Sequence, residues 1–407
     1  MKKTHLLLPA AAFFMTFPAF SQEDVQKDLQ TQFVMAEAGE VIEIPAGHFT
    51  LTKSLWLDQG ENVTIRGAGM DKTVLSFAEQ TEGAEGIKVT GGQHILIEGL
   101  TVQDAKGDAI KTQDVNGITF RAVKTEWSGA PKETNGAYGL YPVLCQNVLI
   151  EGCESIGASD AGIYVGQSKH IIVRNSTAHH NVTGIEIENS EVADVYNNVT
   201  HDNTGGILVF DLPNLVKKKG GHVRVFDNEV RENNHANFAP EGNIVAGVTP
   251  GTGILILATS DVEVFNNRII NNRTTGTSII SYYMTEQPIN DKLYDPYPKR
   301  IFIHDNLYER EAVEASDQTR TGKLYRDQFK FGTDVPHIVW DGILPEDALD
   351  KNGQVKDQYQ ICIRNNTNAS FANLDAQGGF QNISRDLSAY DCTRQSLEAA
   401  DLALEDK

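Results

Sequence analysis

The sequence is poor in proline, cysteine and basic side chains. Its 407 residues include 13 Pro and 4 Cys, and 55 Asp and Glu outnumber 35 Lys and Arg, which gives a formal charge of −20. A chain this acidic is a poor ligand for nucleic acid and for anionic membrane surfaces. No glycine-rich phosphate loop opens a helix and no nucleophile elbow is present, so the motifs favour neither nucleotide nor serine-hydrolase chemistry.

Long apolar runs are also missing, because no stretch after the N-terminus is apolar enough to span a membrane. At the N-terminus, Lys2 and Lys3 precede a short apolar stretch at residues 6–17, and small residues follow up to Ser21. This order is typical of a cleaved signal peptide over residues 1–21, with an uncleaved anchor as the alternative. No Cys follows the stretch, so a lipoprotein anchor is not indicated. We expect a periplasmic or secreted protein that does not insert into membranes.

The central chain repeats short alternating patterns about every 22 residues. One pattern is a tetrapeptide with the best copies at Gly162, Gly184 and Gly206, and looser copies at Gly86, Ala109, Gly139 and Gly253. A second pattern starts at Val173, Val195, Val225, Val264 and Ile301. Alternating apolar and polar residues indicate strands, and no helical stretch or Leu-Asn repeat signature separates them. The sequence therefore predicts an all-β, single-stranded right-handed parallel β-helix of about ten coils over residues 22–310.

Both ends of the predicted coil region differ from its middle. Residues 24–36 form an amphipathic pattern that predicts a capping helix for the first coil. Its apolar side would carry Val25, Leu29 and either Phe33 or Val34. The repeat fades after Asn306, so residues 311–407 are predicted to form an irregular C-terminal cap.

Asparagine recurs at one position of the second pattern, at Asn198, Asn228, Asn267 and Asn306. Stacked amides at a coil corner can bond to one another along the stack, although Asn is also common in ordinary turns. Cys153 and Ser176 precede these residues in the same column, so Cys153 is expected to be a buried small residue. Cys362 and Cys392 are expected to form a disulfide, whereas the state of Cys145 stays open.

Two segments near the start carry a resemblance to a known family. Gly39–Gly47 (GEVIEIPAG) and Val63–Gly69 (VTIRGAG) resemble the opening coils of pectate-lyase-like β-helix proteins. The following coils, to about residue 310, are similar to the carbohydrate-binding and sugar-hydrolase group of right-handed β-helix repeat proteins. The whole chain is similar to an exported bacterial subgroup of these proteins. The resemblance implies the fold and a carbohydrate ligand, but the group includes lyases, hydrolases, epimerases and members without assigned chemistry. The Asp-Pro-His-Asp motif of periplasmic mannuronan C5-epimerases is absent.

Long insertions predict which face of the β-helix binds a ligand. Residues 127–137 and 235–252 interrupt the coil before its first strand, and residues 212–222 and 284–299 interrupt it after that strand. Loops on both sides of one strand column form walls around a groove. Surface insertions that are merely tolerated would instead be scattered among all corners.

Alternation within the first strand of each coil predicts the floor of this groove. Ile163, Val165, Ile185 and Ile187 are expected to point inward, and the residues between them outward into solvent. Coils are spaced about 4.8 Å apart, so the outward residues from Lys111 to Glu186 would span roughly 15 Å, the length of a few sugar units. Two histidines spaced 22 residues apart are expected to stack at a nearby corner.

These residue types suit the removal of a proton beside a uronate carboxylate, which needs a cation, a base and an acid for the leaving oxygen. Lys111 suits the cation, Glu186 or a histidine the base, and a tyrosine the acid. The candidate catalytic residues are Lys111, Tyr141, Tyr164, Glu186, His179 and His201. The candidate substrate-binding residues are Lys88, Asp108, Asp160, Glu188 and Phe210. Ordinary cross-strand pairs on a solvated sheet are the alternative reading of the same residues.

The sequence thus favours a lyase or C5-epimerase-like enzyme that acts on an acidic, uronate-containing polysaccharide. The alternatives are a non-catalytic module that binds glycan or an envelope protein, and a glycosidase. No metal site or cofactor is predicted. The acid content would allow calcium, but no dedicated loop motif indicates it.

Overall fold

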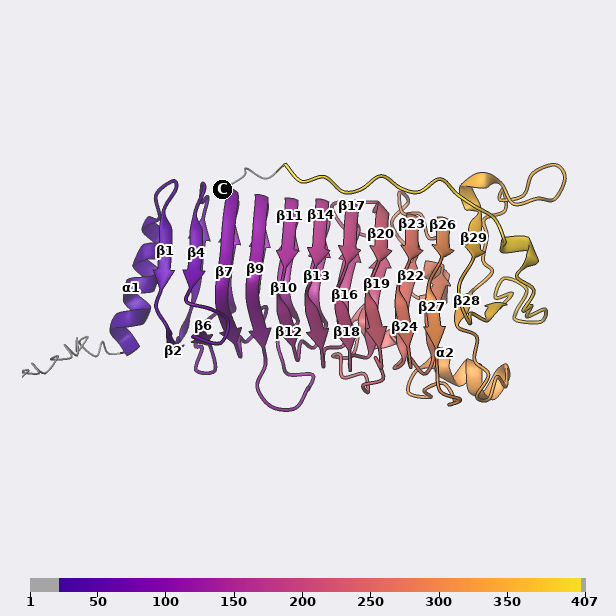
Figure 1. Cartoon of the computed structure of the whole chain (residues 1–407), viewed down its shortest axis with the longest axis horizontal. Helices are drawn as coiled ribbons and strands as arrows, with labels where there is room; N and C mark the ends of the chain where they lie inside the picture. The colour runs from indigo at the N-terminus through magenta and orange to yellow at the C-terminus, as the bar shows by residue number, and fades with distance from the viewer. Residues whose placement is uncertain (1–21, 404–407) are drawn as a thin grey trace, which may run out of the picture.

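In the computed structural model, residues 22–403 are described, and they form a long stack of parallel strands with a helix at one end (Figure 1). The signal peptide predicted over residues 1–21 lies outside the described residues. None of the helices within residues 22–403 is long and apolar enough to cross a membrane.

The strands within residues 22–403 form two parallel sheets. The eleven-stranded sheet consists of β3 (Lys53–Asp58), β6 (Glu82–Thr90), β8 (Ile110–Gln113), β10 (Tyr138–Val143), β13 (Ala161–Gly166), β16 (Thr183–Glu188), β19 (Gly205–Phe210), β22 (Thr252–Leu257), β25 (Thr275–Ile280), β28 (Ile338–Trp340) and β30 (Phe371–Asn373). The nineteen-stranded sheet consists of β1 (Val41–Ile44), β2 (Gly47–Thr50), β4 (Thr64–Gly67), β5 (Thr73–Ser76), β7 (Gln93–Gln103), β9 (Asn116–Glu126), β11 (Gln146–Glu151), β12 (Glu154–Ile156), β14 (Lys169–Arg174), β15 (Thr177–His179), β17 (Glu191–Tyr196), β18 (Val199–His201), β20 (Gly221–Phe226), β21 (Glu229–Arg231), β23 (Ser260–Phe265), β24 (Arg268–Ile270), β26 (Lys299–His304), β27 (Leu307–Glu309) and β29 (Ile361–Arg364).

Each central coil contributes one strand to the eleven-stranded sheet and two short strands to the nineteen-stranded sheet. The coil β13–β14–β15, for example, lies directly under the coil β16–β17–β18. Ile163 pairs in register with Ile185, and Ile185 pairs with Ile207. Because every coil repeats the same register, each residue lies directly between the equivalent residues of the coils above and below it.

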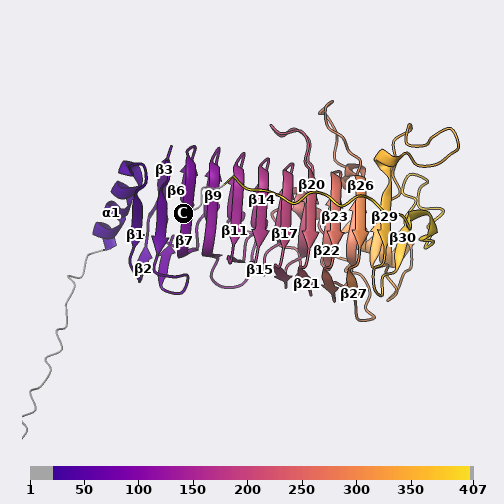
Figure 2. The same cartoon turned by 45° about the horizontal axis from the view of Figure 1, so that its top comes forward.

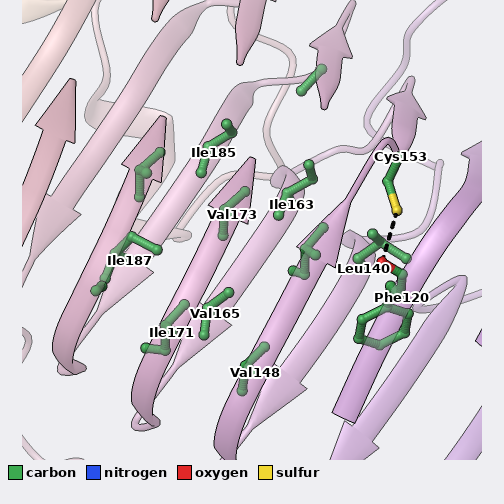
Figure 3. Packing of buried hydrophobic residues seen from close by; sticks show 14 of the residues in the cluster. Phe120, Leu140, Val148, Cys153, Ile163, Val165, Ile171, Val173, Ile185 and Ile187 are labelled. Carbon is green, nitrogen blue, oxygen red and sulfur yellow. Dashed lines mark hydrogen bonds between the residues drawn. The ribbon is translucent and has the colours of Figure 1, made fainter. Parts of the chain in front are cut away.

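The inward positions form one continuous apolar core between the two sheets. Ile163, Val165, Ile185 and Ile187 are at most 1% exposed, as predicted. Figure 3 shows these side chains from the eleven-stranded sheet pointing toward residues of the opposite sheet such as Val173. The predicted inward register is therefore confirmed.

The corner between β14 and β15, and its equivalents, follows a local rule. One residue adopts the left-handed conformation, at Asn175, Asn197, Asp227, Asn266, Asp305 and Asn365, where Asn, Asp and Gly are favoured. The next residue offers its side-chain oxygen to the backbone N–H of its counterpart one coil earlier, as Asn228 does for Asn198 at 3.0 Å. This ladder runs through Cys153, Ser176, Asn198, Asn228, Asn267, Asn306 and Asn366, so the predicted column is confirmed.

A second asparagine ladder lies at the next corner, where the sequence pattern did not predict it. Asn181, Asn203, Asn233 and Asn272 bond from coil to coil, and each follows a residue with positive φ. Buried amides that are fully paired stabilise the corner, whereas an unpaired amide would cost about 1–3 kcal/mol. The two ladders therefore fix the register of the coils at two corners.

Helices and short turns lie outside this stack. The helices are α1 (Gln22–Met35), α2 (Arg320–Lys323) and the single turns η1 (Ile244–Gly247), η2 (Tyr282–Thr285), η3 (Leu324–Gln328), η4 (Asp357–Tyr359) and η5 (Ser388–Tyr390). The helix α1 caps the first coil as predicted, with Leu29 and Phe33 buried, whereas Val34 is 72% exposed.

The coils continue beyond residue 310, where the sequence pattern fades. The strands β28, β29 and β30 pair with β25, β26 and β28, so both sheets extend into the region predicted as an irregular cap. The pattern is hidden because residues 311–337 and 341–360 separate these strands, which removes the 22-residue spacing. The cap proper consists of these long connections and of the chain after β30.

Residues 393–403, here called the strap, return along the outer face of the nineteen-stranded sheet (Figures 1 and 2). The predicted disulfide between Cys362 and Cys392 is present and anchors its start. Downstream, the Leu397 N–H donates to Glu263 on β23 at 2.9 Å, and the Ala403 N–H donates to Asn147 on β11 at 3.1 Å.

The contacts of the strap are spaced regularly along the coils beneath it. Leu397 contacts β23, Ala400 bonds to Asp194 on β17, and Ala403 contacts β11. Each interval of three residues crosses two coils, or about 9.6 Å, which is about 3.2 Å per residue and matches extended chain. The strap therefore lies fully extended across the coils from β23 to β11.

Truncation of an inward residue should destabilise the whole stack. Ile185→Ala leaves a cavity in the core and is expected to lower the free energy of unfolding by about 2–5 kcal/mol. The matched control is Ile172→Ala, which removes the same atoms from a half-buried outer position on β14 and should cost under about half as much. Urea unfolding of both variants decides the register, and equal losses would contradict it.

The cysteines should divide into two classes on labelling. Cys145 and Cys153 are buried free thiols, whereas Cys362 and Cys392 are bonded. Unfolded, non-reduced protein should therefore take up two maleimide labels per chain, and reduced protein should take up four. Four labels without reductant would remove the disulfide from the structure.

Candidate functional site

The outer face of the eleven-stranded sheet gathers aromatic and ionisable side chains on its central strands. One outward column follows the register Lys88, Lys111, Tyr141, Tyr164, Glu186 and Leu208. A parallel column places Glu188 beside Phe210. Asp160 immediately precedes β13, and Asp108 lies two residues before β8. Eleven site residues were predicted, and the nine that are not histidines therefore all lie on this face.

Three tyrosines form a compact group on β10 and β13. The ring centroids of Tyr138, Tyr141 and Tyr164 lie 4.5–4.9 Å apart, and Tyr141 meets Tyr164 edge-on. A Cβ atom at Gly166 would lie 2.1 Å from the Tyr164 hydroxyl, so only glycine leaves space for that ring. The glycine therefore allows Tyr164 to lie flat along its own strand.

Three carboxyl groups adjoin the tyrosines, and the six residues are here called the tyrosine–carboxylate cluster. Tyr138 donates its hydroxyl to Asp160 at 3.3 Å, and Tyr164 bonds to Glu188. The Thr183 hydroxyl donates to Glu186 at 2.5 Å. The other oxygen of Asp160 is buried without a hydrogen-bond partner among the described residues.

Burial decides the protonation of this cluster. Burial raises the pKa of Glu188 to about 8, against the opposing hydrogen bond from Tyr164. Burial also raises the pKa of Glu186 well above its ordinary value, and the neighbouring Asp160 raises it further. Burial raises the pKa of Tyr164 too, so Tyr164, Glu186 and Glu188 hold their protons at neutral pH. The pKa of Asp160 is raised by burial to about 7, so this carboxyl is partly ionised there.

A more accessible strip lies on the N-terminal side of the cluster. Trp56 is 50% exposed, and Lys88, Lys111 and Tyr141 are half-buried. The Lys111 ammonium lies 4.8 Å from the centre of the Tyr141 ring. Burial raises the pKa of Asp108 to about 6, and the Lys111 charge counteracts part of that rise. Lys111, Tyr141 and Asp108 are therefore, together with Lys88, among the ionisable groups that a ligand on this strip would meet.

A cavity of about 670 Å³ lies on the C-terminal side of the cluster, over β19, β22 and β25. Its walls include residues 212–214, 242–249 and 284–287, which belong to three of the four insertions predicted to enclose a groove. The fourth insertion instead places Trp127 in the core, where the indole N–H donates to Ala105 at 2.7 Å. Phe210, predicted to bind substrate, lies on the floor of this cavity.

His179 and His201 lie apart from the cluster, in the nineteen-stranded sheet. They end β15 and β18 and stack with centroids 4.8 Å apart, as the 22-residue spacing predicts. His179 contacts His180 and Glu154, and His201 contacts Asp202. The neighbours of both histidines are thus other corner residues, not the tyrosines or carboxyl groups of the cluster.

Glu186 and Tyr164 point outward as predicted, but the expectation that they face solvent is wrong. Glu186 is 1% exposed and Tyr164 is 4% exposed. Residues of the insertion after β21, Val245 and Val248, pack with Val182 and Leu208 in a second apolar cluster on this face. Strand alternation gives the direction of a side chain, whereas long-range loop packing decides whether water reaches it.

Two functional contacts were not predicted from the sequence. Tyr138 immediately precedes the glycine of its repeat, and strict alternation from the inward Leu140, two residues later, would have pointed it into the core, so the pattern gave no signal for it. Thr183 holds the same position relative to its strand and bonds to Glu186. Neither residue belongs to the predicted outward columns, because those columns start with the residue that follows the recurrent inward Ile or Leu of each repeat.

No group of three or more His, Cys, Asp or Glu side chains within residues 22–403 is arranged to hold a metal ion. The acidic residues of the tyrosine–carboxylate cluster are instead bonded to hydroxyl groups.

Comparisons with known proteins agree with this architecture. The family described as "Right handed beta helix region" matches residues 55–218. The A-module of mannuronan C-5 epimerase AlgE4 from Azotobacter vinelandii is similar, with 15% identity and a TM-score of 0.55 over 86% of this chain and 91% of that chain. The AlgE6 A-module of the same organism is also similar, with 16% identity and a TM-score of 0.55 over 85% and 81%.

At such identities the likeness establishes the fold, and the chain is a right-handed parallel β-helix protein, as predicted. A comparison of the sequence with curated proteins finds no match.

The buried carboxyl of Glu188 should make stability depend on pH. Its pKa of about 8 lies above the ordinary value near 4.3, so its stabilising contribution is complete below about pH 4 and is lost as pH rises through 8. Glu188→Gln keeps an acceptor for Tyr164 and cannot ionise. Its melting temperature should match the parent at pH 5 and exceed it by a few degrees at pH 9.

The exposed Glu79→Gln variant serves as the control, because it should follow the parent at both pH values. A Glu188→Gln variant that melts below the parent at pH 9 would contradict the buried, protonated state.

Proposed function

We propose that this protein is exported and acts on a uronate-containing polysaccharide by proton abstraction, as a lyase or a C5-epimerase-like enzyme. The observation that carries the proposal is the group formed by Lys111, Tyr141 and Asp108 on the accessible strip. It combines a cation, a phenol and a carboxylate within two adjacent coils. The similarity of the fold to two mannuronan C-5 epimerase modules supports a polysaccharide as the ligand.

Each member of this group has a role that follows from its electrostatics. The Lys111 ammonium neutralises the uronate carboxylate and so acidifies the adjacent C5–H. With a pKa of about 6, Asp108 is ionised at neutral pH and accepts that proton. Burial raises the pKa of Tyr141 to about 12, so its hydroxyl stays protonated and serves as the acid.

The two reaction classes share proton abstraction and differ only in the step after it. In a lyase, the electron pair of the C5–H bond forms a C4–C5 double bond, the C4–O bond breaks, and Tyr141 protonates the leaving oxygen. In an epimerase, a proton returns to C5 from the opposite face. Glu186 is a poor base in either case because it is buried and protonated. The histidines, the other base considered from the sequence, lie in the nineteen-stranded sheet, so we assign the role of base to Asp108.

The rival function is a non-catalytic module that binds glycan or an envelope protein. The burial of Tyr164, Glu186 and Asp160 favours it, since these side chains are at most 6% exposed and do not reach a ligand in this state. Purified protein should be screened against alginate, pectin and glucuronan, with and without calcium. Unsaturated product absorbing near 232 nm or an altered uronate ratio supports catalysis, and binding without turnover supports the module. New reducing ends without that absorbance would indicate a glycosidase.

Asp108→Asn and Tyr141→Phe should each lower kcat/KM by about 10²–10⁴-fold, because each removes one proton-transfer group. For the parent, kcat/KM should rise as pH increases through about 6, where Asp108 loses its proton. The measurement is initial rate against pH on the best substrate of the screen.

Tyr196→Phe is the matched control for the tyrosine, because Tyr196 lies on the outer face of the other sheet and stacks on Phe226. Its activity should equal that of the parent. If Asp108→Asn keeps the rate of the parent, Asp108 is not the base.

A further inference from the structure

The cavity over β19, β22 and β25 differs in chemistry from the accessible strip. Its floor consists of Leu208, Phe210, Leu255, Leu257, Ser278 and Ile280, so the floor carries no ionisable side chain. Leu255 and Ile280 are only partly buried there although they are apolar. A uronate carboxylate on this floor would lose its hydration without gaining a cation. The cavity therefore suits an uncharged group.

Hydroxyl groups line one side of the cavity, but they already form hydrogen bonds within the protein. Thr252 donates to the Thr249 carbonyl at 2.7 Å, and Thr274 donates to the Pro250 carbonyl at 2.5 Å. The Thr249 hydroxyl bonds to that of Thr319. An unsubstituted sugar ring would exchange its bonds to water for few bonds here, which disfavours it as the occupant.

The two charged side chains at the mouth of the cavity also pair with each other. Arg320 and Glu286 lie 2.7 Å apart, and their side chains are 53% and 62% exposed. These charged side chains form a solvated rim above the apolar floor of the cavity. A ligand with a polar head and an apolar tail fits this division, and about 670 Å³ is within the usual range for small-molecule sites.

We propose that this cavity binds an acyl chain, with its polar head at the rim beside Arg320 and its methylenes against Leu255, Ile280 and Met284. The chain belongs either to a free fatty acid or to an acyl substituent on a glycan, since both present the same methylenes. The site lies outside the accessible strip and does not depend on the proposed chemistry there.

The test is displacement of a dansyl-labelled undecanoic acid probe from the full-length protein. Octanoate, decanoate and dodecanoate should compete with increasing strength, by up to about fourfold per added methylene until the cavity is full. A dodecanoyl ester of a uronate oligosaccharide that competes better than dodecanoate identifies the glycan as the source, and the reverse order identifies the free acid. Competition by the same oligosaccharide without its acyl group would overturn the proposal.

Leu255→Asn should weaken probe binding at least tenfold, because it places a polar group on the floor. The matched control is Leu293→Asn, which makes the same change at a leucine that is 69% exposed and lies outside the cavity. Met284→Lys at the mouth provides a second test should Leu255→Asn fail to fold. Equal affinity in the parent and in the folded cavity variants, or no probe binding by the parent, would overturn the proposal.

Discussion

The structure depends on one constraint, which is that each coil must sit on the previous one in the same register at a spacing of about 4.8 Å. Backbone hydrogen bonds between coils impose it, and side chains then stack on their own counterparts. Ile163, Ile185 and Ile207 fill the core in this way, and Asn198 and Asn228 pair at the corner. The outer face obeys the same constraint, since Lys111, Tyr141 and Tyr164 are adjacent only because their coils are aligned.

The division of the outer face into three zones follows from where insertions enter this regular stack. Around β6 and β8 the coils are more accessible, and Lys88 and Lys111 are only half-buried. The insertion carrying Val245 and Val248 packs over the face near β19 and creates a second apolar cluster. Between these zones, Glu186 and Glu188 are enclosed and retain their protons. A single sheet therefore presents an ionic strip, a protonated centre and an apolar cavity in sequence along its axis.

Periodicity predicted the features that the repeat controls and failed where the repeat is interrupted. The coil register, the inward isoleucines and the asparagine column at Asn198 follow from the 22-residue spacing, and the structure confirms them. The strands after residue 310 were missed because long connections separate them. The outward direction of Glu186 was correct, but its burial depends on a loop some 60 residues away, which no local pattern encodes. The roles of the candidate site residues stay predictions.

The strap has a consequence for how the chain reaches its native state. Coils can stack one after another in chain order, since each contacts only its neighbours. The contact between Ala403 and Asn147 spans 256 residues, so it joins the strap to a coil that lies far earlier in the chain. A solenoid without such an element folds and frays locally, from either end. Here the strap spans coils from β23 back to β11, so the opening of these coils requires its release, and a one-dimensional array gains long-range cooperativity.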